Sequence, residues 1–407
     1  MKEKPGFWGG LITGLLIALI VLIFILFGES VHNAILGRGF SLPGRSEVLT
    51  SEAREKIDLI NDYINFYYLD YMDDDSSGET PEERAEGMYR GLVESLNDQY
   101  SEYYTAKEYS RLHESNQGSF EGIGVMISPN DDGFFEVSGF TSEESAAKKA
   151  GVEIGDIFYK VDGADVIGID ISELVDKVRG KEGTSVDLVM LRGKDMDEVE
   201  FTVKRMKVES VTVSHNMLEK NTGYIIIGSF DDITVKQFED ALSDLKSKGM
   251  KKLILDLRGN GGGMVNAAVD IADDLISTGV VTYTMDRQGK RIDYEAVTPE
   301  ELGMPLVILV DSHSASASEL LTGALKDHGI GKVVGTTTYG KGIVQNIYPL
   351  SDGSAVKLTN ARYYTPKGLN IQGTGIEPDV VVELDVDAYK KDGKDNQLDK
   401  ALELINQ

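Results

Sequence analysis

A serine-rich segment offers the first chemistry in this sequence. LVILVDSHSASASELL (306–321) is an apolar stretch that runs into serines and alanines. Ser316 could act as a nucleophile, because a serine at a strand-to-helix turn lies beside backbone N–H groups that can bind an oxyanion. Ser316 and Glu319 also match the S-x-x-E spacing of a helix capping box, so this segment could equally well only begin a helix.

A lysine downstream could supply the base that a serine nucleophile needs. Lys341 lies between Gly340 and Gly342 in the segment GTTTYGKG. A lysine acts as a base only if burial lowers its pKa from about 10.4 toward 7–8; the alternative is an ordinary solvated lysine. Gln345 could orient the amine if the chain turns at the glycines, a turn that glycine makes easily.

The same lysine segment has to be tested as a nucleotide site. The span from Gly335 to Lys341 fits most of the P-loop pattern G-x-x-x-x-G-K-[ST], but Gly342 stands where the magnesium-binding hydroxyl is required. The glycine run RGNGGGM (258–264) also fails as a dinucleotide loop, because its third glycine would fall on Met264. Both tests argue against nucleotide binding.

Composition narrows the classes of function further. The formal net charge of −27 argues against nucleic acid as a partner, since binding phosphates needs basic patches. The chain has no cysteine, which removes disulfides, thiolate nucleophiles and cysteine-based zinc sites. It has five histidines and no H-E-x-x-H pattern. We therefore expect neither a metal nor another cofactor.

The N-terminus predicts a membrane anchor. Lys2 and Lys4 precede an uncharged apolar run of 21 residues, 7–27, which can cross a bilayer core of about 30 Å as a helix. The run is longer than the core of a cleaved signal peptide, and no A-x-A cleavage site follows it. The positive-inside rule then places the lysines in the cytoplasm and the rest of the chain outside the cell membrane.

Elements of several kinds must position the serine and the lysine. From Tyr224 onward, predicted strands alternate with predicted helices, which is typical of an α/β fold. Residues 117–206 read as short strands with glycines, whereas 51–109 follow a helical pattern rich in tyrosine. The tail at 396–406 is predicted to form an amphipathic helix.

Together these segments resemble a known family. HSASASE and YGKGIVQ resemble motifs of the carboxy-terminal processing proteases, tail-specific serine peptidases with a Ser/Lys dyad. Three further segments agree: LVESLNDQYSEYYT (92–105), LDLRGNGGG (255–263) and LTNARYYTPKGLNIQGTGIEPD (358–379). The resemblance implies that Ser316 is the nucleophile, Lys341 the general base and Gln345 the residue that orients it. It also implies an oxyanion hole made by the N–H of Ala317 with that of Gly261 or Gly262.

The sequence departs from the family pattern around the nucleophile. Asp311, Ser312 and His313 stand where the family often has Asn-rich residues, and Gly259 stands where asparagine is common. His313 raises the alternative of a Ser/His pair, although a residue so close to Ser316 on one strand end is expected to point elsewhere. These departures leave the substrate preference open.

A PDZ domain is the second part of the resemblance. AGVEIGDIFYKVDG (150–163) is similar to a PDZ stretch, and FEGIGV (120–125) resembles the loop that captures a chain terminus through consecutive N–H groups. The implied carboxylate-binding residues are Gly122, Ile123, Gly124 and Val125. Arg179 matches a position that could link the peptide-bound PDZ domain to the active site.

The predicted fold is an α/β peptidase core with an inserted, β-rich PDZ domain carrying two helices, and with flanking helical segments. The predicted parts are an anchor (1–28), a linker (29–50), a helical region (51–112), the PDZ domain (113–207), the peptidase core (208–384) and a helical tail (385–407). We expect cleavage of proteins that end in apolar tails, and a possible homodimer formed by the flanking helices. The alternative is a catalytically silent PDZ scaffold that binds protein C-termini.

Overall fold

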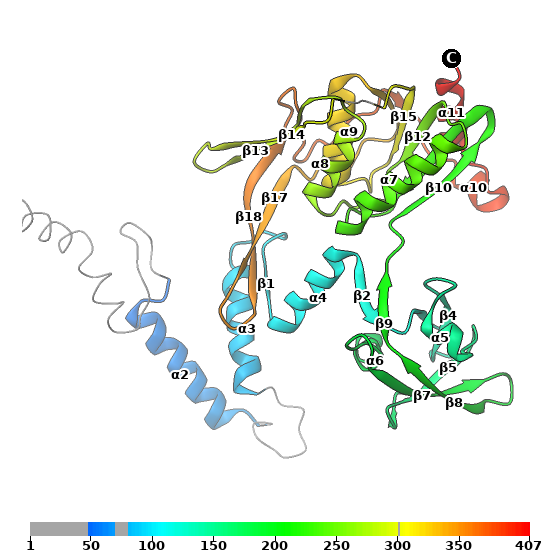
Figure 1. Cartoon of the computed structure of the whole chain (residues 1–407). Coiled ribbons are helices and arrows are strands. Elements are labelled where there is room, and N and C mark those ends of the chain that lie inside the picture. Colours follow the sequence, from blue (N-terminus) through cyan, green and yellow to red (C-terminus); the bar gives the residue numbers. More distant parts are fainter. Residues whose placement is uncertain (1–47, 70–79, 300–301) are drawn as a thin grey trace, which may run out of the picture. The chain divides into compact units, whose positions relative to one another are not determined.

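The computed structural model describes residues 48–69, 80–299 and 302–407 (Figure 1). The described part of the chain divides into two units, with the boundary between Arg84 and Ala85. The predicted anchor (1–28) and most of the predicted linker lie outside the described residues. Within the described ranges, no helix combines the length and the apolar character needed to cross a bilayer.

In its described residues, the predicted N-terminal helical region contains three helices and one short strand. Its elements are α2 (Ser51–Tyr67), α3 (Pro81–Glu94), β1 (Glu102–Tyr104) and α4 (Ala106–Gln117). The helix starts follow local chemistry: Thr105 and Glu108 form a reciprocal capping box at α4. The prediction of helix throughout 51–109 was wrong at β1, because those three residues pair antiparallel with strand β18, far along the chain.

A sheet of six strands forms the centre of the peptidase core. Its order is β10 (Val213–Leu218), β11 (Thr222–Ile227), β12 (Lys252–Asp256), β15 (Leu306–Val310), β16 (Gly331–Gly335) and β19 (Val380–Val381). A short 3-10 helix, η1 (Glu219–Asn221), joins β10 to β11. Only β10 runs antiparallel to its neighbour; the other pairings are parallel. The predicted α/β core is thereby confirmed.

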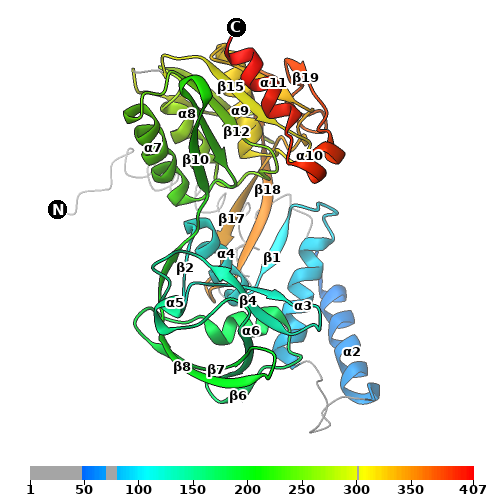
Figure 2. The ribbon, with the colours of Figure 1, turned by 90° about the vertical axis from the view of Figure 1, so that its right-hand side faces the viewer.

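Helices cover both faces of this sheet (Figure 2). On one face lie α7 (Asp232–Ser247), α8 (Val265–Asp273) and α9 (Ala317–His328). The other face is covered by α11 (Asn396–Ile405), which follows the short helix α10 (Val386–Asp392). Ala401 and Ile405 of α11 are buried against the sheet, so the apolar face of the predicted tail helix packs within its own chain.

The central strands are continuous apolar runs because both of their faces are buried. All five residues of β15 are buried, as are four of the five residues of β12. Since parallel strands end at the same edge of a sheet, the segments that follow β12, β15 and β16 meet there. These segments contain the glycine run, Ser316 and Lys341.

A second sheet continues from the lysine segment. Its strands are β1, β13 (Gly279–Asp286), β14 (Arg291–Ala296), β17 (Ile343–Pro349) and β18 (Ala355–Tyr364), with the order β1-β18-β13-β14 and β17 paired to β18. Lys341 immediately precedes β17, and Gln345 lies within it.

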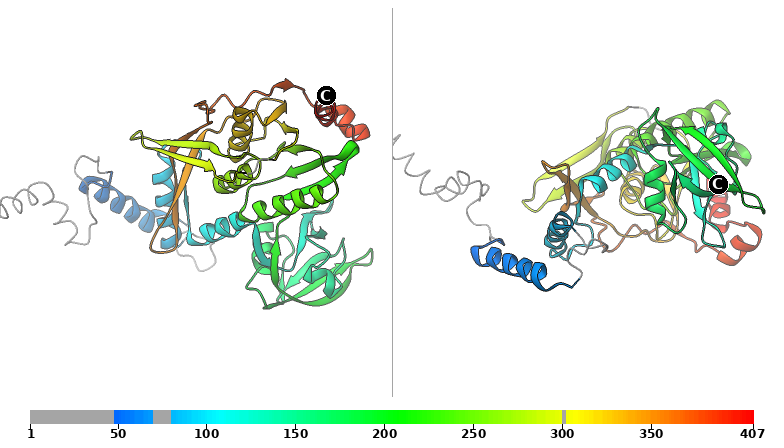
Figure 3. Two further views of the ribbon diagram at one scale, coloured as in Figure 1. Left: turned by 45° about the horizontal axis from the view of Figure 1, so that its top comes forward. Right: turned by 90° about the horizontal axis from the view of Figure 1, so that it is seen from below.

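The region predicted as a PDZ domain forms its own small core. Its strands are β2 (Ser119–Gly122), β3 (Val125–Pro129), β4 (Phe135–Phe140), β5 (Ile157–Val161), β6 (Ala164–Asp165), β7 (Ser185–Arg192), β8 (Asp197–Lys204) and β9 (Met206–Glu209). Its helices are α5 (Ala146–Ala150) and α6 (Ile171–Val178). Phe158, Leu174 and Leu188 are among the residues buried at its centre, and Figure 3 shows these strands in cyan to green from two directions.

Candidate active site

Ser316 occupies a strained turn between β15 and α9. Its backbone angles are φ 54° and ψ −113°, a conformation that costs a residue with a side chain roughly 1–3 kcal/mol. Its N–H donates to Glu319 Oε2 at 2.9 Å, and its carbonyl accepts from Leu320 N at 2.9 Å. The segment therefore begins a helix, as the capping pattern suggests, and it also holds Ser316 in the kind of sharp turn that presents a nucleophile.

Glu319 joins the serine turn to the lysine segment. This carboxylate is fully buried, and Oε2 accepts from the N–H of both Ser316 (2.9 Å) and Lys341 (2.8 Å). Oε1 accepts from Gly340 N (2.7 Å) and Thr338 Oγ1 (2.6 Å). The sequence suggested only a cap for this residue; its position within the apolar run ELLTGAL was the available signal of a buried charge.

Lys341 has the environment that a lysine base requires. It is half-buried, and Nζ lies 4.6 Å from the centroid of the Tyr100 ring. Burial, followed by the charge of Lys357, lowers the pKa of Lys341, while Asp98 opposes that shift. Both effects that lower the pKa disfavour the ammonium form, which is the direction that general-base catalysis needs.

Gln345 belongs to a chain of hydrogen bonds that leads back to Asp98. Its Nε2 donates to Thr359 Oγ1 at 3.2 Å, and Thr359 N donates to Ser101 Oγ at 3.1 Å. Ser101 Oγ donates to Asp98 Oδ2 at 2.7 Å. Burial alone would raise the pKa of Asp98, but the bonds from Ser101 and Thr359 lower it, so its charge persists near Lys341.

Tyr363 is a buried polar residue of this site that the sequence did not reveal. Its N–H donates to Gly342 O at 3.1 Å and its hydroxyl donates to the Lys341 carbonyl. Burial raises the pKa of Tyr363, and a hydrogen bond with the Ser316 side chain opposes that shift. A tyrosine whose pKa is raised stays neutral, so it remains a hydrogen-bond donor at the lysine segment.

The glycine run lies against the nucleophile turn. A Cβ on Gly262 would be 2.7 Å from Ala315 O, 2.8 Å from Ser316 Cβ and 3.0 Å from Ala317 N, and φ is +102°. Only glycine permits this approach. The Gly262 N–H donates to Asn260 Oδ1 at 2.8 Å, which favours Gly261 over Gly262 as the oxyanion donor that accompanies Ala317.

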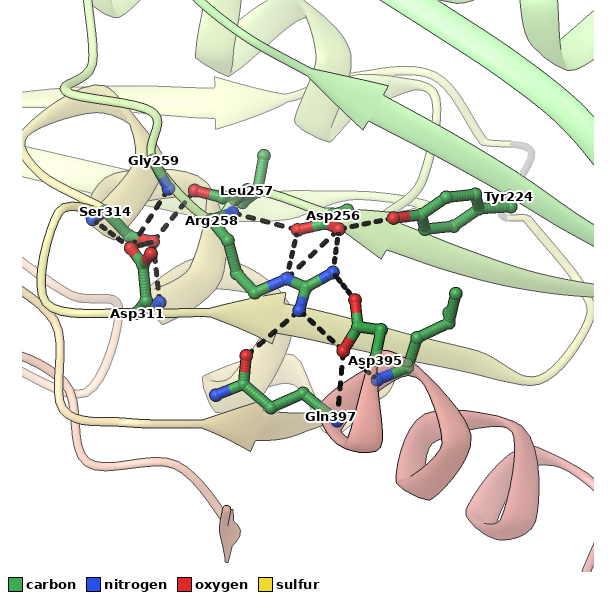
Figure 4. A network of polar contacts seen from close by, with 10 residues as sticks. Tyr224, Asp256, Leu257, Arg258, Gly259, Asp311, Ser314, Asp395 and Gln397 are labelled. Carbon is green, nitrogen blue, oxygen red and sulfur yellow. Dashed lines mark hydrogen bonds and ion pairs between the residues drawn. The ribbon is translucent and has the colours of Figure 1, made fainter. Parts of the chain in front are cut away.

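Asp311 holds the glycine run and the serine turn together (Figure 4). Its Oδ1 accepts from the N–H groups of Gly259 (3.0 Å), His313 (2.9 Å) and Ser314 (3.0 Å). The imidazole of His313 is 77% exposed, with Nδ1 3.7 Å from Asp311 Oδ2. These contacts direct His313 to Asp311, which disfavours the Ser/His alternative.

A groove in the PDZ region contains the predicted carboxylate-binding residues. Gly122, Ile123, Gly124 and Val125 line a groove of about 140 Å³ together with apolar side chains of α6. Ile123 and Gly124 separate β2 from β3, and the φ of Gly124 is +79°. The groove runs beside β3. In the part of the chain that the structure describes, β3 is an edge strand of its sheet.

Arg179 lies at the end of α6, where it also lines this groove. Its guanidinium carbon is 4.5 Å from the centroid of the Phe120 ring. Its Nη1 is 3.6 Å from Glu114 Oε2 on α4. Arg179 thus contacts a groove-lining residue and the helix α4, which leads into the PDZ region.

Comparisons with known proteins agree with this geometry. The model of peptidase family S41 matches residues 221–382, and a PDZ domain model matches residues 142–192. The carboxy-terminal processing protease CtpA of Bacillus subtilis is 33% identical over 367 residues, which cover 90% of this chain and 76% of that relative. The chain belongs to the carboxy-terminal processing proteases of family S41.

One more curated relative and one solved structure are similar over much of the chain. A probable CtpA-like serine protease of Staphylococcus haemolyticus is 35% identical over 340 residues, covering 82% of this chain and 66% of that relative. The chain thus spans about two thirds to three quarters of the length of these curated relatives. Among solved structures, the photosystem II D1 C-terminal processing protease is 29% identical with a TM-score of 0.47, covering 80% of this chain and 86% of that one.

The predicted family and fold class are therefore confirmed. The S41 match contains Ser316, Lys341 and Gln345, and the PDZ match contains Arg179. The predicted carboxylate-binding loop at 122–125 precedes the PDZ match. The roles of these individual residues remain predictions. Their physical grounds are the hydrogen bonds, burial and distances of the serine turn, the lysine segment and the groove.

Proposed function

We propose that this chain is a membrane-anchored, extracytoplasmic serine endopeptidase that recognises proteins by their C-terminal tails. The observation that carries the proposal is the buried Glu319 carboxylate, which binds the backbone of both Ser316 and Lys341. A strained serine and a half-buried lysine whose pKa is lowered are thereby held at one site. That arrangement supports a Ser/Lys dyad, with Gln345 acting through Thr359 and Ser101.

The reaction is acyl transfer in two steps. The neutral amine of Lys341 takes the proton of Ser316 Oγ as this oxygen attacks the peptide carbonyl. The oxyanion is held by the N–H groups of Ala317 and Gly261, where each donor contributes roughly 3–4 kcal/mol. The ammonium of Lys341 then protonates the leaving amine, and water, activated by the same lysine, hydrolyses the acyl-enzyme.

Substrate selection follows from the groove in the PDZ region. An extended tail adds as a strand along the edge of β3, and its carboxylate is captured by the backbone at 122–125. Ile171, Val175 and Val178 of α6 give the groove an apolar wall, which favours apolar tails. Arg179 contacts this groove and α4, so we assign it the role of reporting occupancy to the peptidase core.

The anchor and the assembly are proposed on separate grounds. The apolar run at 7–27, preceded by Lys2 and Lys4, supports a single-pass anchor with the catalytic part outside the cell membrane. Exposed apolar residues on α2 and α3, among them Tyr63 and Met88, support a homodimer formed by these helices.

Cleavage assays with the full chain in detergent test the central proposal. The substrate is an unfolded protein with an apolar C-terminal tail, and the variants are Ser316→Ala and Lys341→Ala. We expect cleavage by the wild type alone, and loss of cleavage when the tail ends in charged residues. Equal tail binding by all three proteins, with no cleavage across a range of pH, would instead establish the silent scaffold.

A further inference from the structure

We infer that Asp395, in the C-terminal tail, is a positioning residue for the glycine run that supplies the oxyanion donor. The inference rests on the proposed peptidase function and adds to it a residue outside the S41 match. Its basis is a buried ionic network that joins the start of α11 to the residue preceding the glycines (Figure 4).

The contact between Asp395 and Arg258 is bidentate. Arg258 Nη1 lies 3.0 Å from Asp395 Oδ1, and Nη2 lies 2.8 Å from Oδ2. Gln397 Oε1 accepts from the same Nη1 at 3.0 Å. Each side chain of the Arg258–Asp395 pair is only 15% exposed. A paired fork of this kind fixes the plane and the direction of the guanidinium.

The other edge of the same guanidinium is held by Asp256. Arg258 Nε is 3.0 Å from Asp256 Oδ1 and Nη2 is 2.6 Å from Oδ2, while Tyr224 donates its hydroxyl to Oδ2 at 2.6 Å. Burial would lower the pKa of Arg258, but both carboxylates raise it. Burial would also raise the pKa of Asp395, but Arg258 lowers it. The pair therefore stays ionised, and loss of Asp395 leaves the guanidinium with one carboxylate for its charge.

The glycine run is attached to this network at Arg258, and to other parts of the core at Gly259 and Asn260. Arg258 N donates to Asp256 Oδ1 at 3.0 Å, which ties the backbone at the start of the run to the same network. Beyond it, the carbonyl of Asn260 accepts from Ala315 N (3.0 Å) and Ser318 Oγ (2.9 Å), on the serine turn. Gly261 follows directly after Asn260, and the residues before it are fastened to the ionic network at Arg258, to Asp311 at Gly259 and to the serine turn at Asn260. We expect a shift of Arg258 to pass along this short stretch of backbone to the Gly261 N–H.

Asp395 has a second role that a suitable substitution preserves. Its Oδ1 accepts from Gln397 N (3.0 Å) and Leu398 N (2.9 Å), so it caps the N-terminus of α11. Asparagine is an equally good N-cap but lacks the charge and the second acceptor oxygen. Asp395→Asn therefore removes the charge that supports Arg258 and keeps the cap at the start of α11. Asp385, which caps α10 through Ala388 N and has no arginine among its contacts in the described chain, provides the matched control Asp385→Asn.

The experiment compares the wild type, Asp395→Asn and Asp385→Asn as full chains in detergent. It measures kcat and KM on the apolar-tailed substrate, the affinity for the tail peptide, and hydrogen–deuterium exchange at 257–263 and in α11. For Asp395→Asn we expect kcat to fall about tenfold or more, because small misplacement of a catalytic group has effects of that order. We expect KM and tail affinity within about twofold, faster exchange at 257–263 and unchanged protection of α11. Asp385→Asn should match the wild type throughout.

Two results would overturn the inference. One is unchanged exchange at 257–263 in Asp395→Asn, whether or not the wild type cleaves the substrate. The other is equal loss of protection in α11 and in the glycine run, which would mean that the residue serves only the stability of the tail. Failure of the proposed function would be seen in a different comparison. If the wild type cleaves no better than Ser316→Ala, the peptidase proposal fails. The exchange of Asp395→Asn relative to the wild type still tests the positioning role in that case.

Discussion

At the scale of single residues, the site depends on a serine that is held in a costly conformation by a buried carboxylate. The backbone of Ser316 is kept at positive φ while its N–H and that of Lys341 share one oxygen of Glu319. A strained conformation persists only where its surroundings over-determine it. Glu319 provides that constraint, and it fixes the backbone of the base through the same atom.

Replacement of Glu319 by glutamine tests this constraint. The amide nitrogen of Glu319→Gln would face N–H or O–H donors in place of an acceptor oxygen, leaving buried donors unpaired. We expect the free energy of unfolding to fall by roughly 2–4 kcal/mol and cleavage to be largely lost. Denaturant titration and the cleavage rate measure the two effects. Thr338→Val removes one donor to Glu319 and also leaves Ile376 N without its acceptor, but it keeps the carboxylate, so it should retain more activity than Glu319→Gln. Wild-type kcat in Glu319→Gln would contradict the assigned role.

The surroundings of Lys341 predict how activity depends on pH. The base must be neutral, so cleavage should increase with pH through the pKa of Lys341, which lies below its usual value. Lys357 lowers that pKa and Asp98 raises it. The rising limb should therefore move to higher pH in Lys357→Gln and to lower pH in Asp98→Asn. Profiles of kcat/KM against pH for both variants check the signs, and shifts in the same direction would exclude Lys341 as the titrating base.

At the scale of elements, the parallel strands determine which segments meet. The strands β12 and β15 were predictable because burial on both faces makes them continuous apolar runs. The serine turn and the lysine segment were predictable from local motifs. By contrast, β1 is only three residues long and forms by pairing with β18. Such a short segment has no alternation of apolar and polar residues from which a strand could be predicted.

The supporting contacts of the site could not be predicted for the same physical reason. Tyr363 reaches the lysine segment only because β18 pairs with β17, and Asp395 reaches Arg258 only because α11 packs on the central sheet. Each contact depends on the relative position of elements far apart in sequence. Residue type and spacing carry no signal for such contacts.

The approach of the glycine run to the serine turn gives a prediction with an internal control. In Gly262→Ala the new Cβ would lie 2.7 Å from Ala315 O at a φ of +102°, whereas a Cβ on Gly261 meets nothing within 4 Å. We expect Gly262→Ala to lose roughly 1–3 kcal/mol of stability together with activity, and Gly261→Ala to unfold close to the wild type. Urea denaturation of both variants provides the measurement. Equal stabilities would mean that the run does not pack against Ser316 as described.

At the scale of the whole molecule, recognition and chemistry are assigned to different parts of the chain. The groove beside β3 contains no candidate catalytic residue, and the peptidase core contains the strained serine. The proposed regulation of the core by the groove needs a residue that links the two. Arg179 is the residue whose contacts suit that task, since it stacks on Phe120 and approaches Glu114 of α4.

Substitution of Arg179 tests that link. In Arg179→Ala we expect a tail peptide to bind nearly as in the wild type but no longer to stimulate cleavage of a substrate supplied separately. Lys181→Ala, an exposed basic residue two positions further along the chain, is the matched control and should keep the stimulation. Parallel measurements of binding and of cleavage rate separate the two effects. Unchanged stimulation in Arg179→Ala would end this assignment.

The position of Asp395 has a consequence for the order in which the active site is completed during synthesis. A ribosome makes the chain from its N-terminus, so Ser316 and Lys341 exist well before Asp395 has been joined to them. Until α11 is complete and covers its face of the sheet, a growing chain has its nucleophile and its base but lacks one support of the glycine run. A chain that stops before α11 would then keep its nucleophile and its base without this support, so we expect it to cleave more slowly than a chain that contains α11.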